Sequence, residues 1–320
     1  MEQKTSLKEI SRLLLDPAFD RVLVACHRSP DGDAVGSSHA LAYALRKMGK
    51  QARVFSPDPF DGKFSYITKA EEEIAPFSPE RFVTVDVAAP SMLPGAPFLD
   101  RVDLVLDHHR ISTLPGKVRW ICPESASCGE IVLDLLREME VPFDAYLALA
   151  LYTAVATDTG CFRYSNTNKQ TFSAAAFLSD FVPEGAFYRV NKALFETKTG
   201  LQISLESYAA SRMKLAAEGK IAYLSVSRET QKDLGARYED LDPLINVLRQ
   251  LKGVVLSLVI KEREEGIFKV SVRSEEGFDA SEFCRVFGGG GHKAAAGCDL
   301  AGKEEEVVRA LLTEAERRLA

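Results

Sequence analysis

The stretch RVLVACHRSPDGD, residues 21–33, decides the fold of the first half of the chain. After Arg21, five consecutive apolar residues form a run that is typical of a buried strand in a parallel sheet. A helix is expected over 34–48, and short apolar runs then alternate with helical segments. We therefore expect an α/β fold with a parallel sheet and helices on both faces. Further strands are expected at 52–55, 82–86 and 103–106, and further helices at 130–139, 145–157 and 171–181.

The second half of the chain follows a different pattern. A largely helical stretch over 189–214 is followed, from about residue 220, by apolar runs that predict a smaller α+β domain with a mixed sheet. Its strands are expected at 221–227, 254–262 and 268–274, with a final helix over 304–320. The predicted organisation is an N-terminal domain over 1–188, a helical connector over 189–216 and a C-terminal domain over 217–320.

Composition limits the class of protein. A chain of 320 residues exceeds what one core usually serves, which favours two domains. The net charge of −6 argues against a binder of long nucleic acid, but it allows a substrate with only a few phosphates. The six cysteines include no CxxC pair, and no stretch is long and apolar enough to span a bilayer. We expect a cytoplasmic protein with reduced thiols and no membrane partner.

Acidic and imidazole side chains follow the predicted strands and the helix at 145–157. Because the carboxyl ends of parallel strands meet at one edge of a sheet, we expect these side chains to converge. Singly, each has an ordinary explanation as a turn residue or a helix cap. Together, five carboxylates and three imidazoles would repel one another unless cations lay among them. They are Asp31, Asp33, Asp86, Asp107 and Asp158 with His27, His108 and His109.

The donor types indicate which ions fit. Carboxylates with a minority of imidazoles suit Mn²⁺, Mg²⁺ or a similar ion better than a structural zinc. The set has more donors than one octahedral ion can use, so two ions are more plausible than one. Paired ions are a standard arrangement for phosphoryl chemistry.

The order of these motifs resembles the DHH phosphoesterase family. The matching elements are H-x-x-x-D-x-D at 27–33, the single Asp86, D-H-H at 107–109 and D-T-G at 158–160. The run GGGGH at 288–292 resembles the signature of the DHH-associated C-terminal domain. Length and spacing are similar to the bacterial nano-RNase and pAp phosphatase branch of the family, for which a homodimer would also fit.

The resemblance implies a role for each motif position. Two divalent ions, manganese by preference with magnesium or cobalt as alternatives, would share Asp86. His109 would face the substrate phosphate, and Asp107 would hold a neighbouring imidazole in its tautomer. The implied metal ligands are His27, Asp31 and Asp86 for one ion, and Asp33, Asp86, His108 and Asp158 for the other.

Substrate contacts are expected mainly in the second half. Taken alone, the glycine run would be read as a flexible loop, but the resemblance implies that it holds substrate, since consecutive glycines let backbone N–H groups approach an anion. The guanidinium of Arg273 suits a terminal phosphate. Arg163 and Tyr164 could reach the cleft, although surface or packing roles are equally open for them. His39 lies within the first helix and is interpreted as structural. The glycine-loop candidates are Gly289, Gly290, Gly291 and His292.

The expected function is hydrolysis by a dimetal phosphoesterase without a protein nucleophile. The resemblance implies short oligoribonucleotides, including dinucleotides such as pApA, and 3′-phosphoadenosine 5′-phosphate as substrates, with mononucleotides as products. Alternatives within the same enzyme class are a cyclic-dinucleotide phosphodiesterase and a RecJ-like single-strand exonuclease. A nucleotide-binding regulator without turnover is the alternative from a different class.

Overall fold

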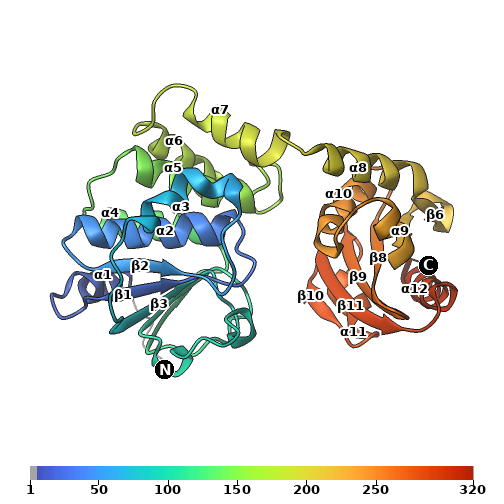
Figure 1. Ribbon diagram of the computed structural model, residues 1–320, viewed down its shortest axis with the longest axis horizontal. Helices are drawn as coiled ribbons and strands as arrows, with labels where there is room; N and C mark the ends of the chain where they lie inside the picture. The colour runs from blue at the N-terminus through green and yellow to red at the C-terminus, as the bar shows by residue number, and fades with distance from the viewer. Residues whose placement is uncertain (1–5, 320) are drawn as a thin grey trace. The chain divides into compact units, whose positions relative to one another are not determined.

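The computed structural model describes residues 6–319, apart from the side chains of residues 72 and 292. The chain divides into two compact units, Met1–Thr197 and Lys198–Ala320. Each unit is built around its own sheet and its own apolar core (Figure 1). None of the helices in the described range has the length and apolarity that a bilayer crossing requires.

The first unit contains a five-stranded sheet in which every strand pair is parallel. The strand order is β2-β1-β3-β4-β5, so the chain leaves β1 for one neighbour and returns to its other side. The topology therefore reverses between β1 and β3, and ligands of such folds bind outside the carboxyl ends of the strands at this point. The strands are β1 Val22–Ala25, β2 Ala52–Phe55, β3 Arg81–Val85, β4 Leu104–Asp107 and β5 Val118–Ile121.

The two faces of this sheet are covered differently. Val22, Val24 and Val83 belong to the main core, which the helices build on one face (Figure 1). Leu23 and Phe82 contribute to a second cluster, which the segment over 87–102 completes with its short 3₁₀ helices η2 Pro90–Met92 and η3 Leu99–Arg101. The α-helices of the unit are α1 Leu7–Leu15, α2 Gly32–Lys47, α3 Ser65–Glu72, α4 Cys128–Glu138, α5 Ala145–Asp158, α6 Lys169–Ser179 and α7 Ala186–Asn191.

Close packing between α2 and its neighbours fixes the edge of the sheet where function is expected. Asp31 is the N-cap of α2, and its side chain accepts hydrogen bonds from the N–H groups of Asp33 and Ala34. A Cβ at Gly36 would lie 2.2 Å from the carbonyl oxygen of Ala150, so only glycine allows α2 and α5 to approach this closely. The start of α2 and the end of α5 are thereby held in a fixed relation.

The second unit has a six-stranded mixed sheet with the order β10-β11-β9-β8-β7-β6. Only β7 and β8 pair in parallel. Helices α11 Ala280–Arg285 and α12 Glu304–Leu319 contribute to the core on one face, and α8 Gly200–Arg212, η6 Tyr238–Leu244 and α10 Ile245–Arg249 to the core on the other. The strands are β6 Lys214–Ala216, β7 Ile221–Val226, β8 Leu256–Glu264, β9 Ile267–Ser274, β10 Gly290–His292 and β11 Ala295–Ala301; α9 spans Arg228–Asp233.

The expected fold class is confirmed, with a parallel α/β unit followed by a smaller α+β unit with a mixed sheet. The expectation of helices on both faces of the parallel sheet holds for α-helices on one face, whereas short 3₁₀ helices cover the other. The helical stretch expected over 189–214 is interrupted between η4 Lys192–Glu196 and α8. The boundary between the two units falls in this interruption, inside the predicted connector.

Candidate metal centre and active site

Asp86 lies at the centre of the converging residues. It follows β3 with a backbone φ of 61°, a left-handed conformation that few non-glycine residues adopt. Its side chain is buried and has an imidazole on each side. His27 Nε2 lies 3.6 Å from Asp86 Oδ2, and His108 Nε2 lies 3.6 Å from Asp86 Oδ1. One carboxylate is thus positioned to serve two neighbouring ions.

The first group of donors surrounds His27. The Nδ1 atom of His27 lies 2.7 Å from the carbonyl oxygen of Arg28, which favours a proton on Nδ1 and turns Nε2 toward the carboxylates. His27 Nε2 lies 3.8 Å from Asp31 Oδ1. Ligand atoms of His27, Asp31 and Asp86 all lie within 4.8 Å of one another, as a bound ion requires.

The second group surrounds His108. Its Nδ1 lies 3.3 Å from the carbonyl oxygen of Ser125, and its Nε2 lies 3.8 Å from Asp33 Oδ2 and 3.2 Å from Asp158 Oδ2. Asp33 is completely buried, and its two oxygens accept hydrogen bonds from the N–H groups of Cys128 and Gly129 at the start of α4. The second group therefore combines Asp33 of α2, held by the start of α4, with Asp158 at the end of α5 and His108 directly after β4.

His109 and Asp107 form a separate pair beside Asp86. His109 Nδ1 lies 2.7 Å from Asp107 Oδ1, and the backbone N–H of His109 donates to the same oxygen. This contact places Nδ1 toward Asp107 and Nε2 on the opposite side of the ring. The hydrogen bond to Asp107 raises the pKa of His109 above its usual value, which favours the protonated ring.

The electrostatics of the cluster fit bound cations. Burial and the charges of Asp158 and Asp86 raise the pKa of Asp33 well above its usual range. Burial and the charges of Asp31 and Asp86 raise the pKa of Asp158 in the same way. Although burial opposes it, hydrogen bonds to Asp31 and Asp86 raise the pKa of His27 to about 10. Without cations the cluster retains protons, and divalent ions would neutralise the same charges.

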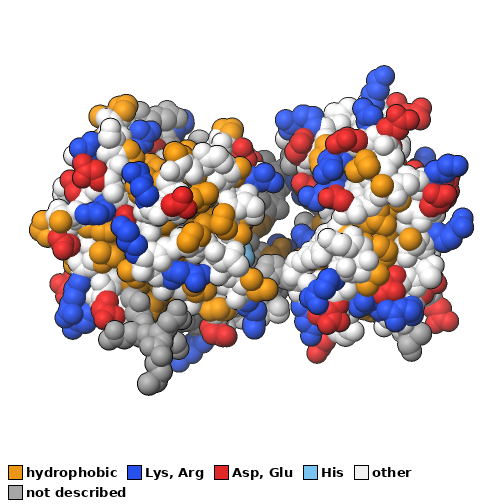
Figure 2. Space-filling view, turned by 90° about the horizontal axis from the view of Figure 1, so that it is seen from below, with side chains coloured by type: hydrophobic (Ala, Val, Ile, Leu, Met, Phe, Trp, Pro, Cys, Tyr) orange, Lys and Arg blue, Asp and Glu red, His pale blue; other side chains and the backbone are white. Residues whose placement is uncertain are grey.

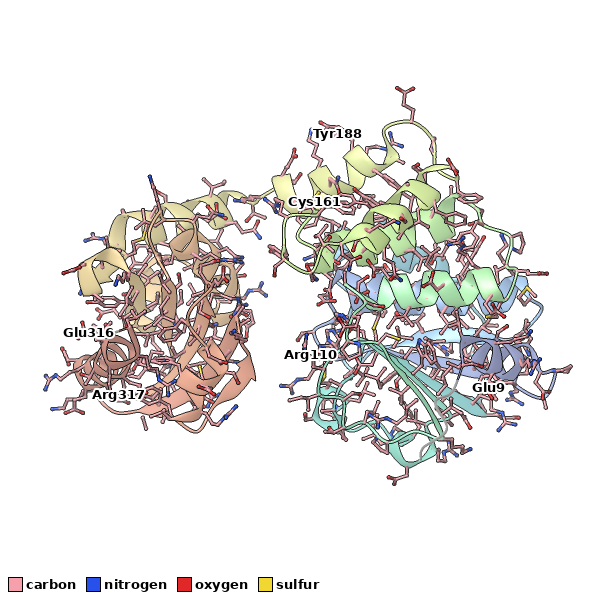
Figure 3. The ribbon with its side chains drawn as sticks, turned by 180° about the vertical axis from the view of Figure 1, so that it is seen from behind. Glu9, Arg110, Cys161, Tyr188, Glu316 and Arg317 are labelled. Carbon is pink, nitrogen blue, oxygen red and sulfur yellow. The ribbon has the colours of Figure 1, made fainter. Side chains whose placement is uncertain are left out.

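A tight turn follows Asp158. Gly160, Cys161 and Phe162 all have positive φ values, of 56°, 58° and 63°. The side-chain amide of Asn166 donates to the carbonyl oxygen of Asp158, and Arg163 Nε donates to that of Gly160. Arg163 thus lies on the turn beside the cluster. Figure 3 labels Arg110, next to the D-H-H triplet, and Cys161 on this turn.

The remaining candidates lie in the second unit. In the sheet, the backbone of Arg273 pairs with Ala295, which in turn pairs with His292, so Arg273 lies two strands from the end of the glycine run. The side chain of His292 lies outside the described part of the structure. A cavity of about 480 Å³ runs along the glycine loop and is also lined by Lys269 and Ser271, which the sequence analysis did not single out.

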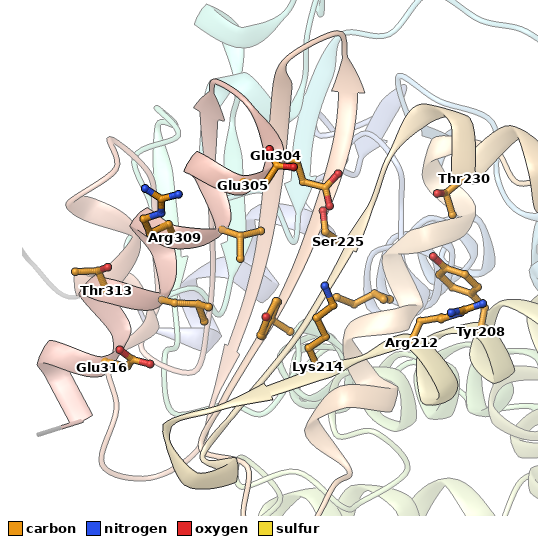
Figure 4. A pocket seen from close by; sticks show the side chains of 14 residues that line it. Tyr208, Arg212, Lys214, Ser225, Thr230, Glu304, Glu305, Arg309, Thr313 and Glu316 are labelled. Atoms are coloured by element: carbon orange, nitrogen blue, oxygen red, sulfur yellow. The ribbon is translucent and has the colours of Figure 1, made fainter.

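A second, larger cavity of the same unit is lined by residues that do not belong to the glycine loop. It has a volume of about 700 Å³ and lies between α12, β7 and the end of α8, with Lys214, Tyr208 and Arg309 on its walls (Figure 4). Acidic side chains of α12, including Glu304, share this cavity. Because acidic and basic side chains both line it, this cavity suits an anion less well than the glycine loop does.

Cys128 is the residue at the centre that the motifs did not predict. It is the first residue of α4 and is completely buried, and its Sγ lies 3.7 Å from Asp86 Oδ1. Ligand atoms of Cys128, Asp33, Asp86 and His108 all lie within 4.8 Å of one another. Only the placement of α4 in the folded unit brings this thiol to the cluster.

Two family models match the chain in succession. The model described as DHH family, N-terminal domain, matches residues 21–155, and the model described as DHHA1 domain matches residues 218–320. The bifunctional oligoribonuclease and PAP phosphatase NrnA of Thermus thermophilus is 33% identical over 290 residues, which cover 88% of this chain and 84% of that protein. The protein of the same name from Bacillus subtilis is 23% identical over 88% of this chain and 90% of its own length.

Solved structures share the fold. An exopolyphosphatase-related protein from Bacteroides fragilis superposes with a TM-score of 0.85 at 22% identity, covering 97% of this chain and 96% of that one. RecJ from Thermus thermophilus, in complex with Mn²⁺, superposes with a TM-score of 0.55 at 14% identity, covering 97% of this chain and 54% of that one.

Proposed function

Because this chain belongs to the DHH family, we propose that it is a dimetal phosphoesterase that hydrolyses short oligoribonucleotides, including pApA, and 3′-phosphoadenosine 5′-phosphate to mononucleotides. The observation that carries the proposal is the position of Asp86, whose two oxygens each lie 3.6 Å from a different imidazole. The substrate class is supported by the Thermus relative, an oligoribonuclease and PAP phosphatase that matches over most of both chains.

The metal ligands in this proposal follow from the two groups of donors. His27, Asp31 and Asp86 would hold one divalent ion, and Asp33, Asp86, His108 and Asp158 the other. Bound ions would acidify a water and stabilise the charge that develops on phosphorus and the leaving oxygen. Manganese is the proposed ion, because carboxylates with a minority of imidazoles suit it and because RecJ, which shares the fold, was solved with Mn²⁺.

The other residues bind and orient the substrate. His109, held by Asp107 and favoured in its protonated form, would donate a hydrogen bond to a phosphate oxygen and steady its charge. Arg273 would bind a terminal phosphate with its planar guanidinium. Backbone N–H groups of the glycine loop would contact the remaining phosphate oxygens.

The distribution of charge supports a short substrate. On the face seen in Figure 2, acidic and basic side chains are interspersed over both units instead of gathering into one basic surface. The whole chain carries a net charge of −6. Long nucleic acid is bound mainly through many phosphate contacts, whereas a dinucleotide needs only a few.

A substrate panel tests the proposal directly. The full chain with Mn²⁺ would be assayed on pApA, a five-nucleotide RNA, 3′-phosphoadenosine 5′-phosphate, a cyclic dinucleotide, long single-stranded DNA and pyrophosphate. We expect fastest turnover on the first three. Preference for long DNA or pyrophosphate would contradict the proposed substrate class, and nucleotide binding without hydrolysis under any divalent ion would contradict the enzyme.

A further inference from the structure

Cys128 lies among the metal-ligand candidates without belonging to any of their motifs. Its side chain is completely buried, and its Sγ lies 3.7 Å from Asp86 Oδ1 and 3.8 Å from the carbonyl oxygen of Leu106. Its backbone N–H donates to Asp33 Oδ2 at 2.6 Å. The residue thus contacts two of the carboxylates that would bind metal, one through its main chain and one through sulfur.

The spacing of these donors suits a small four-coordinate ion. The separation of Cys128 Sγ and Asp86 Oδ1 is 3.7 Å, that of His108 Nε2 and Asp86 Oδ1 is 3.6 Å, and that of His108 Nε2 and Asp33 Oδ2 is 3.8 Å. A tetrahedral ion with zinc-like bond lengths holds its donors about 3.3–3.8 Å apart. These three separations are compatible with such an ion, and all four ligand atoms lie within 4.8 Å of one another.

Two ligand sets share the same three donors. Asp158, the fourth ligand of the proposed manganese site, has its Oδ2 3.2 Å from His108 Nε2. The ligand atoms of Asp33, Asp86 and His108 lie within 4.8 Å of one another and of Cys128 Sγ. The first set is dominated by oxygen and suits Mn²⁺ or Mg²⁺. The second adds sulfur, which thiophilic ions prefer.

We propose that Cys128 is an alternative sulfur ligand of this centre, through which a thiophilic divalent ion such as Zn²⁺ binds in a closed site and inhibits the enzyme. Binding forms a metal–sulfur bond, breaks the S–H bond and releases the proton to solvent. A four-coordinate ion with only protein ligands has no open position for substrate or water, which is the property of structural zinc sites. The inference rests on the proposed metal-dependent function, because it uses three of the same donors.

Cobalt spectroscopy tests the sulfur ligand without depending on activity. The metal-free full chain would be titrated with Co²⁺ while the near-ultraviolet and visible spectra are recorded. We expect a thiolate-to-cobalt charge-transfer band in the wild type, its loss in Cys128→Ser and Cys128→Ala, and its retention in Cys161→Ser. Cys161 is the matched control because it is a second cysteine of the same unit, lies on the turn after Asp158 and belongs to none of the donor groups found in the described residues. A band that persists in both Cys128 variants would overturn the proposal.

Metal competition gives the second readout. Zn²⁺ and Mn²⁺ affinities would be measured against a chromophoric chelator for wild type, Cys128→Ser and Cys161→Ser, with circular dichroism to verify folding. We expect Cys128→Ser to weaken Zn²⁺ binding by at least ~10-fold and Mn²⁺ binding by less than about threefold. Equal losses for both ions would overturn the inference, because they would indicate a general effect on the centre.

The same experiments separate failure of this inference from failure of the proposed function. If wild-type chain binds Co²⁺ without a charge-transfer band but hydrolyses pApA with Mn²⁺, the sulfur ligand is wrong and the function stands. If it binds no divalent ion at all, both are wrong.

Discussion

Asp86 combines a left-handed backbone with a carboxylate that lies between two imidazoles. A left-handed φ costs most residues about 1–2 kcal/mol, but asparagine adopts it at least as readily as aspartate. Asp86→Asn should therefore fold normally while losing the charge that both ions would share. We expect turnover to fall at least about a thousandfold, equivalent to about 4 kcal/mol of transition-state stabilisation. The measurement is kcat on pApA with saturating Mn²⁺.

Asp103→Asn is the matched control for this change. Asp103 is a second buried carboxylate of the same unit, and its side chain accepts hydrogen bonds from Phe82 N and Lys117 Nζ, away from the cluster. Its variant should lose some stability and keep its activity. Turnover near the wild-type value in Asp86→Asn would contradict the shared-ligand role.

The contact between His109 and Asp107 predicts a shift in the pH profile. Hydrogen bonding to Asp107 raises the pKa of His109, so Asp107→Asn should lower that pKa toward the ordinary value. If protonated His109 donates to the phosphate, kcat/KM falls as the pH rises through this pKa. The fall should then begin at lower pH in Asp107→Asn. An unchanged alkaline limb would remove His109 from the role of proton-bearing donor.

At the scale of the elements, the glycine run divides into structural and open positions. A Cβ at Gly289 would lie 2.2 Å from the carbonyl oxygen of Gly297, and one at Gly291 would lie 2.6 Å from that of Ala295. Gly291 also has a φ of 146°, whereas a Cβ at Gly290 would meet nothing within 4 Å. Glycine is therefore required at Gly291 within β10 and at Gly289 directly before it, because both lie close against the backbone of β11.

Alanine substitutions should separate stability from substrate binding along this strand. We expect Gly290→Ala to change the free energy of unfolding by less than about 1 kcal/mol, and Gly289→Ala and Gly291→Ala to cost more because backbone must move. If backbone N–H groups of this run contact phosphate, an added Cβ should hinder that approach, and Gly290→Ala should raise KM for pApA. Urea unfolding and steady-state kinetics measure both. A normal KM in Gly290→Ala would remove this position from the phosphate contact.

The sequence was most informative where an element has a strong local pattern. The apolar runs that became β1, β3 and β4 end directly before the charged residues, so their convergence followed from parallel topology alone. β5 was not among the predicted strands, because it is a partly exposed edge strand without a continuous apolar run. Edge strands carry a weaker pattern because one side lacks a neighbour.

Cys128 could not be predicted for a different reason. Its approach to Asp86 depends on how α4 packs, and a Cβ at Gly129 would lie 2.6 Å from the Cβ of Ala154 in α5. Such contacts between helices leave no periodic signal in the chain. The structural roles of Gly289 and Gly291 could not be predicted for the same reason, since only the folded sheet shows which glycines lie against a neighbouring strand.

At the scale of the whole molecule, the metal-free cluster couples stability to pH. His27 gains its partners on folding, so its contribution is present below its ordinary pKa of about 6.5 and is lost as the pH rises toward about 10. Burial and neighbouring anions raise the pKa values of Asp33 and Asp158, so the folded chain holds protons that the unfolded chain releases. Both effects lower stability as the pH rises.

The metal-free chain should therefore melt at a lower temperature at about pH 8.5 than at about pH 6. Added Mn²⁺ should oppose this fall, because its ligands must be deprotonated and a cation then replaces the bound protons. At 100 times the dissociation constant an ion contributes about 2.7 kcal/mol, or about 5–10 °C for a unit of this size. Thermal melts with and without Mn²⁺ measure both terms, and Asp86→Asn should show the smaller response to metal. A melting temperature of the metal-free chain that rises over this pH range would contradict the charge arrangement, because it would mean that the folded state binds fewer protons than the unfolded one.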